Sequence, residues 1–353
     1  MPRFYVIRQN PHKQVIYWLL TGCVLVYVMV VVGCITRLTH SGLSITDWSV
    51  MGTLPPLSQE SWAEHFAKYQ QSPEYRIINS NMTLDDFKSI FWWEWTHRMI
   101  GRTIGFVFFA GFIYFLVRKK LTRPLLIKCI TLLCIGALQG LVGWWMVASG
   151  LVKNPYVSHY RLATHLMTAF TAFAFAFWFA LQLIFEHDAA YNSANEGRKL
   201  FKVSLVAFIA LVFQVIYGAF VAGLKAGLYC PTWPKMCDEW YPSEIIHQTD
   251  SVIYNFTSGG AGVQFIHRTF AWVVVAFIIC LWARSGKLKL SAWQNKGITW
   301  LIYLTTLQIM LGIFTLLYSV PVVLGVLHQS VAFFLFATFL FVLFHFHKKT
   351  AQP

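Results

Sequence analysis

The sequence has few charged residues, and acidic residues are the scarcest of them. Only 12% of its 353 residues are charged, and 14 Asp and Glu stand against 28 Lys and Arg. Hydrophobic residues make up 57% of the chain and aromatic residues 17%. This balance excludes an ordinary soluble domain and indicates a protein whose solvent is the lipid bilayer.

Long apolar runs recur along the chain, each of about the 20 residues that a helix needs to cross roughly 30 Å of hydrocarbon. We expect eight spans, near residues 15–37, 96–117, 125–149, 160–185, 201–224, 263–283, 297–319 and 324–346. The predicted fold class is therefore an all-α integral membrane protein with eight transmembrane helices.

The first apolar run lacks a small-residue cleavage site and no transit peptide precedes it, so we expect it to remain as a helix. This favours a bacterial plasma (inner) membrane over the mitochondrial inner membrane. The net charge of +14 does not indicate nucleic-acid binding, because 17 of the 28 Lys and Arg fall in alternate loops and at the two ends. That distribution predicts cytoplasmic termini.

The two halves of the chain are related by an internal duplication. Segments 94–98, 138–143 and 165–170 match 264–268, 307–312 and 328–333 at offsets of 170, 169 and 163, and the exits of the first and fifth spans match at 185. Because each half holds an even number of spans, the copies share one orientation in the membrane. We predict two parallel-repeat four-helix bundles, residues 1–186 and 201–353, joined by a cytoplasmic linker at 187–200.

The long outer segment of the first half, residues 38–94, is predicted to hold two helical features. The spacing of Trp62, Phe66 and Tyr69 indicates an amphipathic helix on the membrane surface. Thr83 followed by Asp86 is typical of a helix N-terminus, so a second helix is expected to run from there into the next span.

Four of the twelve histidines lie toward the outer ends of the even-numbered spans: His97, His165, His267 and His328. A polar side chain at that depth usually faces the bundle interior or a site. Two imidazoles from different helices at similar depth are what a haem iron requires. Each could instead hydrogen-bond a neighbouring helix. Their repeat-related positions favour haem ligation, with one pair in each half.

The halves differ at the position three residues before the first histidine of each pair, which is Glu94 in one and Gln264 in the other. Residues three apart share a helix face, so Glu94 is expected beside its histidine. A carboxylate there could relay protons or stabilise positive charge on a substrate carbon. The alternative is a structural ion pair with Arg98 or Arg102. The Gln in the second half favours a catalytic Glu94 and a reactive first half.

Two further features concern the outer side of the chain. Arg161, one turn outward of His165, is placed to bind a haem propionate, although an arginine at a helix end also commonly anchors the membrane interface. Cys230 and Cys237 share an outer loop rich in Pro and Trp. Oxidation is permitted there, so a local disulfide is predicted, with its redox state left open.

These residues resemble the haem A synthase family, membrane enzymes that make haem A for cytochrome oxidases, and specifically its branch that includes the mitochondrial enzymes. The resemblance covers nearly the whole chain. It depends on Glu94-Trp-Thr-His97-Arg98, on the three other span histidines, and on the outer segment Arg37-Leu-Thr-His-Ser-Gly42-Leu-Ser followed by Trp48, Gly52, Pro55-Pro56 and Pro73-Glu74.

The resemblance implies oxidation of the C8 methyl of haem O to a formyl group, by successive hydroxylations that consume dioxygen. By the same resemblance, His97 and His165 would hold the substrate or product haem, with Glu94 and His97 catalytic. His267 and His328 would hold a haem b. A haem O synthase is the expected partner, while the electron donor and the existence of a homo-oligomer stay open.

Part of the family carries a cysteine pair in the first outer loop, proposed there to act in the reaction or in redox exchange. This chain has no cysteine in that loop, which excludes such a role here. Cys230 and Cys237 match the family's second-half pair. Two other functions remain as alternatives, a dihaem b-type cytochrome that takes electrons from quinol and a transporter built from parallel repeats.

Overall fold

The computed structural model describes residues 10–47, 52, 54–152, 155–186, 196–247 and 251–347. Eight helices in these residues are long and apolar enough to cross a membrane, which confirms the predicted fold class. They are α2 (Lys13–Leu38), α5 (Leu84–Val117), α6 (Arg123–Leu151), α7 (His159–Ile184), α9 (Phe201–Gly223), α12 (Gly260–Ser285), α13 (Ala292–Leu317) and α14 (Val322–Phe346). Short elements between them are α3 (Gln59–Gln70), α4 (Pro73–Ile77), η1 (Glu196–Leu200), η2 (Ala226–Leu228), α10 (Glu244–His247) and α11 (Val252–Thr257).

Contacts divide the chain into two compact units. One comprises Thr21–Phe173, and the other comprises Met1–Leu20 with Ala174–Pro353. The boundaries fall inside α2 and α7, so the ends of these helices that lie near the predicted cytoplasmic side belong to the second unit. The predicted linker at 187–200 lies largely outside the described residues, and the predicted division at that linker stays a prediction.

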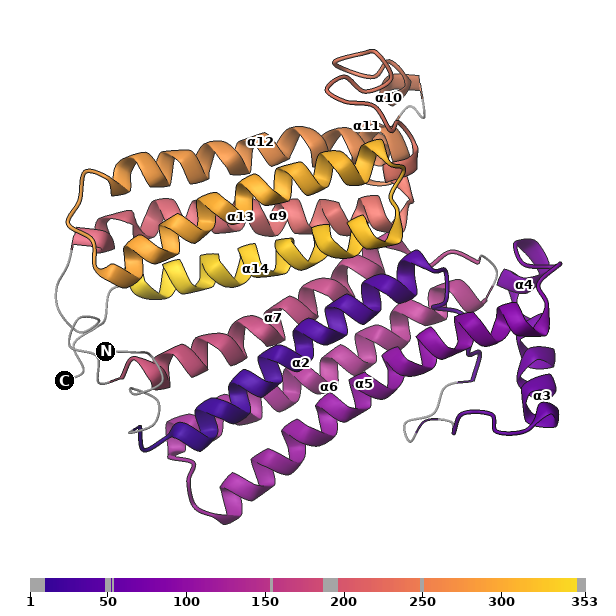
Figure 1. The fold of residues 1–353 in the computed structure, drawn as a ribbon, viewed down its shortest axis with the longest axis horizontal. Helices are drawn as coiled ribbons and strands as arrows, with labels where there is room; N and C mark the ends of the chain where they lie inside the picture. The colour runs from indigo at the N-terminus through magenta and orange to yellow at the C-terminus, as the bar shows by residue number, and fades with distance from the viewer. Residues whose placement is uncertain are drawn as a thin grey trace. The chain divides into compact units, whose positions relative to one another are not determined.

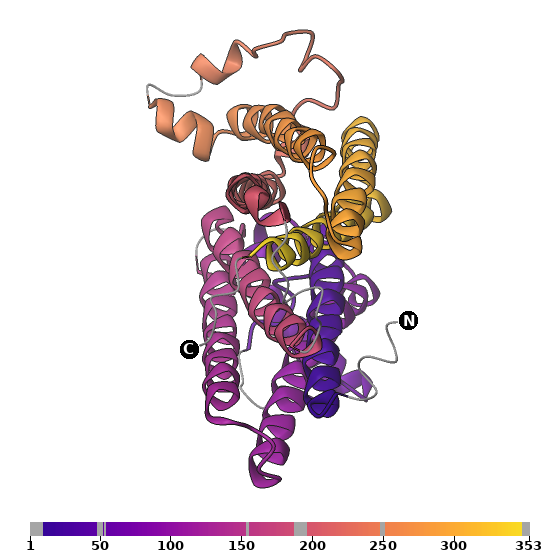
Figure 2. The same ribbon diagram turned by 90° about the vertical axis from the view of Figure 1, so that its left-hand side faces the viewer.

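The second unit contains a closed ring of four helices. Helix α9 packs on α12 and α14, and α13 packs on the same two helices. Figure 1 shows these four helices running side by side, and Figure 2 shows the same bundle from its end. Helix α14 is predominantly apolar without a distinct polar face, and it is the most buried of the eight described spans. All four helices of this bundle come from the second half of the sequence.

Helix α5 is the longest element, because its outer part and its membrane span form one continuous helix of 34 residues. At 1.5 Å per residue this is about 50 Å, well beyond the roughly 30 Å of hydrocarbon. It begins at a capping box, in which Thr83 accepts from the backbone of Asp86 and Asp86 accepts from the backbone of Thr83. The predicted helix start at Thr83 is confirmed.

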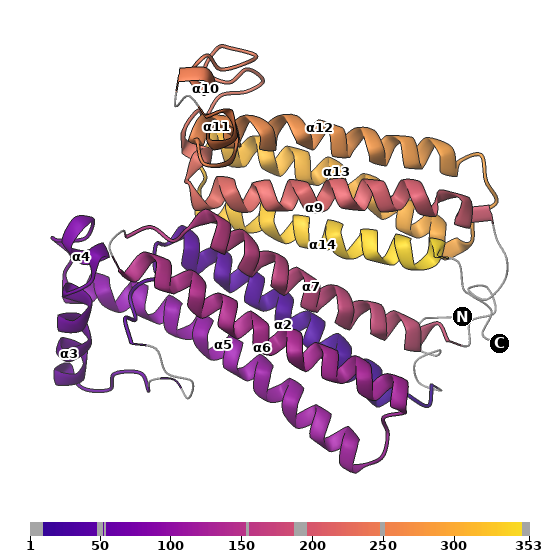
Figure 3. The same cartoon turned by 180° about the vertical axis from the view of Figure 1, so that it is seen from behind.

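Helix α3 confirms the predicted outer helix but not its predicted partner. Its buried residues Trp62 and Tyr69 pack against Phe87 and Phe91 of α5, with Trp62 edge-on to Phe91 at 5.1 Å between ring centroids. Figure 3 shows α3 lying across the N-terminal end of α5. The N-terminal turns of α5 thus present an aromatic surface that covers the apolar stripe of α3. The sequence had predicted that this stripe would face the membrane surface.

Candidate functional site

The four histidines lie on α5, α7, α12 and α14 and form one pair in each unit. His97 and His165 both belong to Thr21–Phe173, and their imidazoles lie within electrostatic range of each other. His267 and His328 form the equivalent pair in the second unit. Each pair therefore brings together imidazoles from two helices that are not neighbours in the sequence, and such a pair could hold the iron of one haem.

Each histidine packs against a glycine on the preceding span. A Cβ added to Gly143 of α6 would lie 2.9 Å from Cε1 of His165, and one added to Gly312 of α13 would lie 3.0 Å from Cε1 of His328. Both distances are at or below the limit that real Cβ atoms reach. These positions accept only glycine without moving the ring.

The same contact occurs between the other two pairs of consecutive spans. A Cβ on Gly33 of α2 would lie 3.2 Å from Nε2 of His97, and one on Gly218 of α9 would lie 3.2 Å from Cε1 of His267. Gly33 and Gly218 are related by the offset of 185 that also relates the exits of the first and fifth spans. The duplication thus extends to the surroundings of each imidazole.

Glutamine amides accompany three of the imidazoles. Gln139 Nε2 lies 3.4 Å from His165 Nε2, and its repeat partner Gln308 lies 3.3 Å from His328 Nε2. Gln214 Nε2 lies 3.2 Å from Nδ1 of His267 and donates to the backbone carbonyl of His267 at 2.8 Å. Such partners fix ring orientation around a ligated metal.

The chemistry of these sites fits a haem. Nδ1 of His165 and Nδ1 of His328 are buried and have no hydrogen-bond partner among the described residues. Buried polar atoms are nearly always paired, so an orphaned imidazole nitrogen in each unit is notable. Neutral imidazoles held between apolar helices are the donors that haem iron takes. The residues present could therefore hold one haem per unit.

Glu94 is buried, and all of its hydrogen-bonding capacity is used within the first unit. Its Oε1 accepts from Arg98 Nη2 at 2.6 Å and Nε at 3.0 Å, and its Oε2 accepts from Ser44 Oγ and the Ile45 backbone N–H, both at 2.7 Å. The structural ion pair with Arg98, weighed above as the alternative role, is present. Arg98 also donates to the carbonyls of Ile45 and Asp47, at 2.8 and 3.0 Å.

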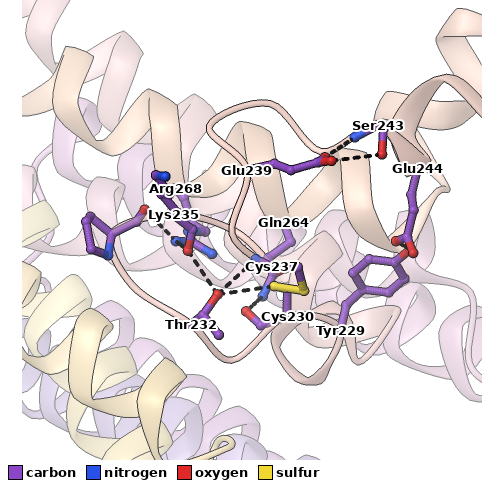
Figure 4. The surroundings of a disulfide bond; sticks show 11 residues. Tyr229, Cys230, Thr232, Lys235, Cys237, Glu239, Ser243, Glu244, Gln264 and Arg268 are labelled. Atoms are coloured by element: carbon purple, nitrogen blue, oxygen red, sulfur yellow. Dashed lines mark hydrogen bonds between the residues drawn. A yellow bond between two sulfur atoms is a disulfide. The ribbon is translucent and has the colours of Figure 1, made fainter.

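In the second unit, Gln264 and Arg268 hold the loop that follows α9 (Figure 4). Gln264 Nε2 donates to the Cys230 carbonyl at 3.1 Å, and Arg268 Nη2 donates to the carbonyls of Pro234 and Lys235. Cys230 and Cys237 form a disulfide with a Cα–Cα distance of 5.7 Å, as predicted.

Residues 16–340 match the COX15-CtaA family of cytochrome oxidase assembly proteins. The chain belongs to this family. It is 49% identical over 344 residues to the Heme A synthase of Flavobacterium johnsoniae, a match that covers 96% of this chain and 100% of that protein. It is 44% identical over 332 residues to the Heme A synthase of Nitrosospira multiformis, covering 94% and 92%.

Membership of the COX15-CtaA family also extends to a plant relative. The Heme A synthase COX15 of Arabidopsis thaliana is 41% identical over 326 residues, covering 90% of this chain and 71% of that protein. These matches span both halves of the duplication, and they confirm the family resemblance drawn from the residues above.

Within this COX15-CtaA chain, Arg161 lies against the C-terminal part of α6. Its Nη1 donates to the Trp145 carbonyl at 2.8 Å, and its guanidinium lies 4.5 Å from the centroid of the Trp145 ring. This contact gives the guanidinium a backbone acceptor and shields the cation with an aromatic face. The predicted role of Arg161 toward a propionate stays a prediction.

Several residues of the site were not identified from the sequence. Gly33, Gly218 and Gln214 were not singled out, and Ser44 was noted only as part of a matching segment. The offset of 185 could have identified the two glycines, because it aligns them with each other. The same offset places Met29 opposite Gln214, so no matching signal pointed to that glutamine.

Proposed function

We propose that this chain is a haem A synthase, which oxidises the C8 methyl of haem O to a formyl group and so supplies haem A to terminal oxidases. Support comes from its family and from relatives named Heme A synthase over nearly its full length. The observation that carries the proposal is the pair of repeat-related imidazole sites, each ring lying on a glycine.

In this proposal the two sites have different occupants. His97 and His165 bind the haem that is substrate and then product, and His267 and His328 bind a haem b. Bound haem supplies the redox-active iron, with dioxygen as co-substrate and reducing equivalents from a donor not yet identified. The protein's own residues ligate and orient the two porphyrins, and the apolar helices exclude water from them.

The cellular setting follows from the same proposal. The chain would lie in a bacterial plasma membrane with both termini cytoplasmic, as the positive-inside distribution indicates. Haem O would come from a haem O synthase in the same bilayer, because haem O is an apolar product that stays in the membrane. A homo-oligomer is compatible with this arrangement.

The test is co-expression of this chain with a haem O synthase in a host that makes no haem A. Extracted pigments should contain haem A, and the purified chain should contain haem B together with haem O or haem A. A strain that expresses only the haem O synthase is the control. Haem B alone in the purified chain, with no haem A in the cells, would favour a dihaem cytochrome and overturn the proposal.

A further inference from the structure

The segment that follows α2, residues Ser41–Asp47, is largely buried up to Ile45 although it is a connection between helices, and only its end at Asp47 is exposed. Ser41, Ser44 and Ile45 are 0%, 2% and 4% exposed, whereas connecting segments usually lie in solvent. Ile45 packs with the aromatic side chains at the contact of α3 and α5. Leu43 contacts α6 so closely that a Cβ on Gly150 would lie 3.0 Å from it. The segment therefore fills the outer end of the first unit.

Glu94 and Arg98 bind the backbone of this segment, one as a hydrogen-bond acceptor and the other as a donor. The carboxylate of Glu94 accepts from the Ile45 N–H, and the guanidinium of Arg98 donates to the Ile45 and Asp47 carbonyls. These residues lie three positions before and one position after His97 on the same helix. The helical turn that presents the imidazole thus also fixes the outer segment above it.

The second unit repeats this attachment with the polarity of one hydrogen bond reversed. The offset of 185 aligns Ile45 with Cys230, and the offset of 170 aligns Glu94 with Gln264. Ile45 presents an N–H to Glu94, whereas Cys230 presents a carbonyl to Gln264. An N–H requires an acceptor and a carbonyl requires a donor. Glu94 therefore matches the backbone N–H of Ile45, and Gln264 matches the backbone carbonyl of Cys230.

We propose that Glu94 and Arg98 are positioning residues, which hold Ser41–Asp47 as the fixed outer wall of the first haem site. In this role the acid at position 94 accepts hydrogen bonds from the segment and does not exchange protons with the substrate. Both carboxylate oxygens already accept two hydrogen bonds each, several of them charge-assisted. The inference rests on the proposed function and assigns how Glu94 serves it.

The experiment compares variants of the full chain co-expressed with a haem O synthase. Glu94→Gln keeps an acceptor for Ser44 and Ile45, and Glu94→Leu removes it at similar size. Arg98→Ala releases the segment's carbonyls while leaving the carboxylate. Lys88→Ala is the matched control, because it removes a cation of α5 that pairs with Asp85 and does not contact the segment Ser41–Asp47 in any hydrogen bond or ion pair described above. The readouts are haem A yield, haem B content of the second unit, and hydrogen exchange of the Ile45 amide.

Positioning predicts that Glu94→Gln keeps the Ile45 amide protected and keeps haem A yield within about tenfold of the original chain. Glu94→Leu and Arg98→Ala should each speed exchange and lower the yield by more than about tenfold, as expected for lost charged hydrogen bonds. Ser44→Ala, which leaves the Glu94–Arg98 pair in place, should cause a smaller loss of about fivefold. Haem B content should stay unchanged throughout.

Two outcomes would overturn the inference. If Glu94→Gln keeps the protection but makes as little haem A as Glu94→Leu, the carboxylate acts directly in the chemistry. If Arg98→Ala and Glu94→Leu exchange like the original chain, the segment is not held by these residues. Absence of haem A from the original chain would instead count against the proposed function. If Glu94→Leu loses haem B as well, its fold is disturbed, and the comparison of Glu94→Gln with Arg98→Ala then tests the inference.

Discussion

At the scale of the residue, the contacts between imidazoles and glycines define how closely the spans of each unit approach. At Gly143 an added Cβ would lie 2.9 Å from Cε1 of His165, closer than real Cβ atoms come to a neighbour, so the ring or the helix would have to shift. Small residues let membrane helices approach closely. Here the glycine makes room for an imidazole ring of the neighbouring helix and not for the backbone of that helix.

Gly143→Ala should therefore displace His165 and weaken haem retention in the first unit about tenfold, since overpacking costs about 1–3 kcal/mol. The measurement is the haem content of the purified chain, with haem O or haem A separated from haem B. Gly140→Ala is the matched control, because a Cβ at Gly140 on the same helix meets nothing within 4 Å. Equal haem retention in the two variants would show that the glycine contact is not needed.

The sequence singled out the four histidines of the candidate site, but it did not show that each ring packs on a glycine. A histidine in an apolar span is conspicuous because burying it is unfavourable without a partner. A glycine in a membrane helix is common, and its role depends on which neighbouring side chain it faces. The role of Glu94 was likewise open, because the sequence does not show whether Ser44 and Ile45 reach its carboxylate.

At the scale of the element, hydropathy predicts the spans well wherever the helix lies in hydrocarbon. Helix α5 departs from this rule because its outer turns, held by a capping box and by aromatic contacts with α3, lie beyond the apolar run. In the sequence, only the capping residues Thr83 and Asp86 indicate that the helix begins before the apolar run. The packing of α3 against α5 was missed because an amphipathic stripe can face either lipid or protein.

The loop after α9 is the element that a disulfide constrains. Closing a loop of this length stabilises by about 2 kcal/mol in the chain-entropy account. Replacing Cys230 and Cys237 together by Ser should loosen the loop that Gln264 and Arg268 hold, and so lower haem B retention in the second unit.

The first unit has no such bond, so its haem should be retained as before in the double variant. The measurement is the ratio of haem B to haem O plus haem A in the purified chain, with and without reductant. Reductant should reproduce the effect in the original chain and change nothing in the double variant. Loss of both haems in equal measure would contradict a local role for this loop.

At the scale of the whole molecule, the duplication relates sites that differ in detail. The matched offsets predicted the parallel repeat, the position of each histidine and the even distribution of sites between the halves. The boundary of the compact units inside α2 and α7 could not be read from the sequence, because it depends on packing at one end of these helices, where Leu181 and Phe185 meet Phe344. The sequence repeat identifies equivalent positions in the two halves, and the contacts in the structure show where the two halves differ.

The two units should bind haem independently, since each contains its own imidazole pair. Replacing His97 and His165 by Ala should leave haem B in the second unit and remove about half of the total haem, and replacing His267 and His328 should remove haem B. His159→Ala is the control, because this residue is the nearest histidine outside the pairs. Absorbance in the Soret region and pigment extraction measure both sites. If the first double variant loses all haem while its helical content is unchanged, the units do not bind separately, and the duplication would describe one shared site.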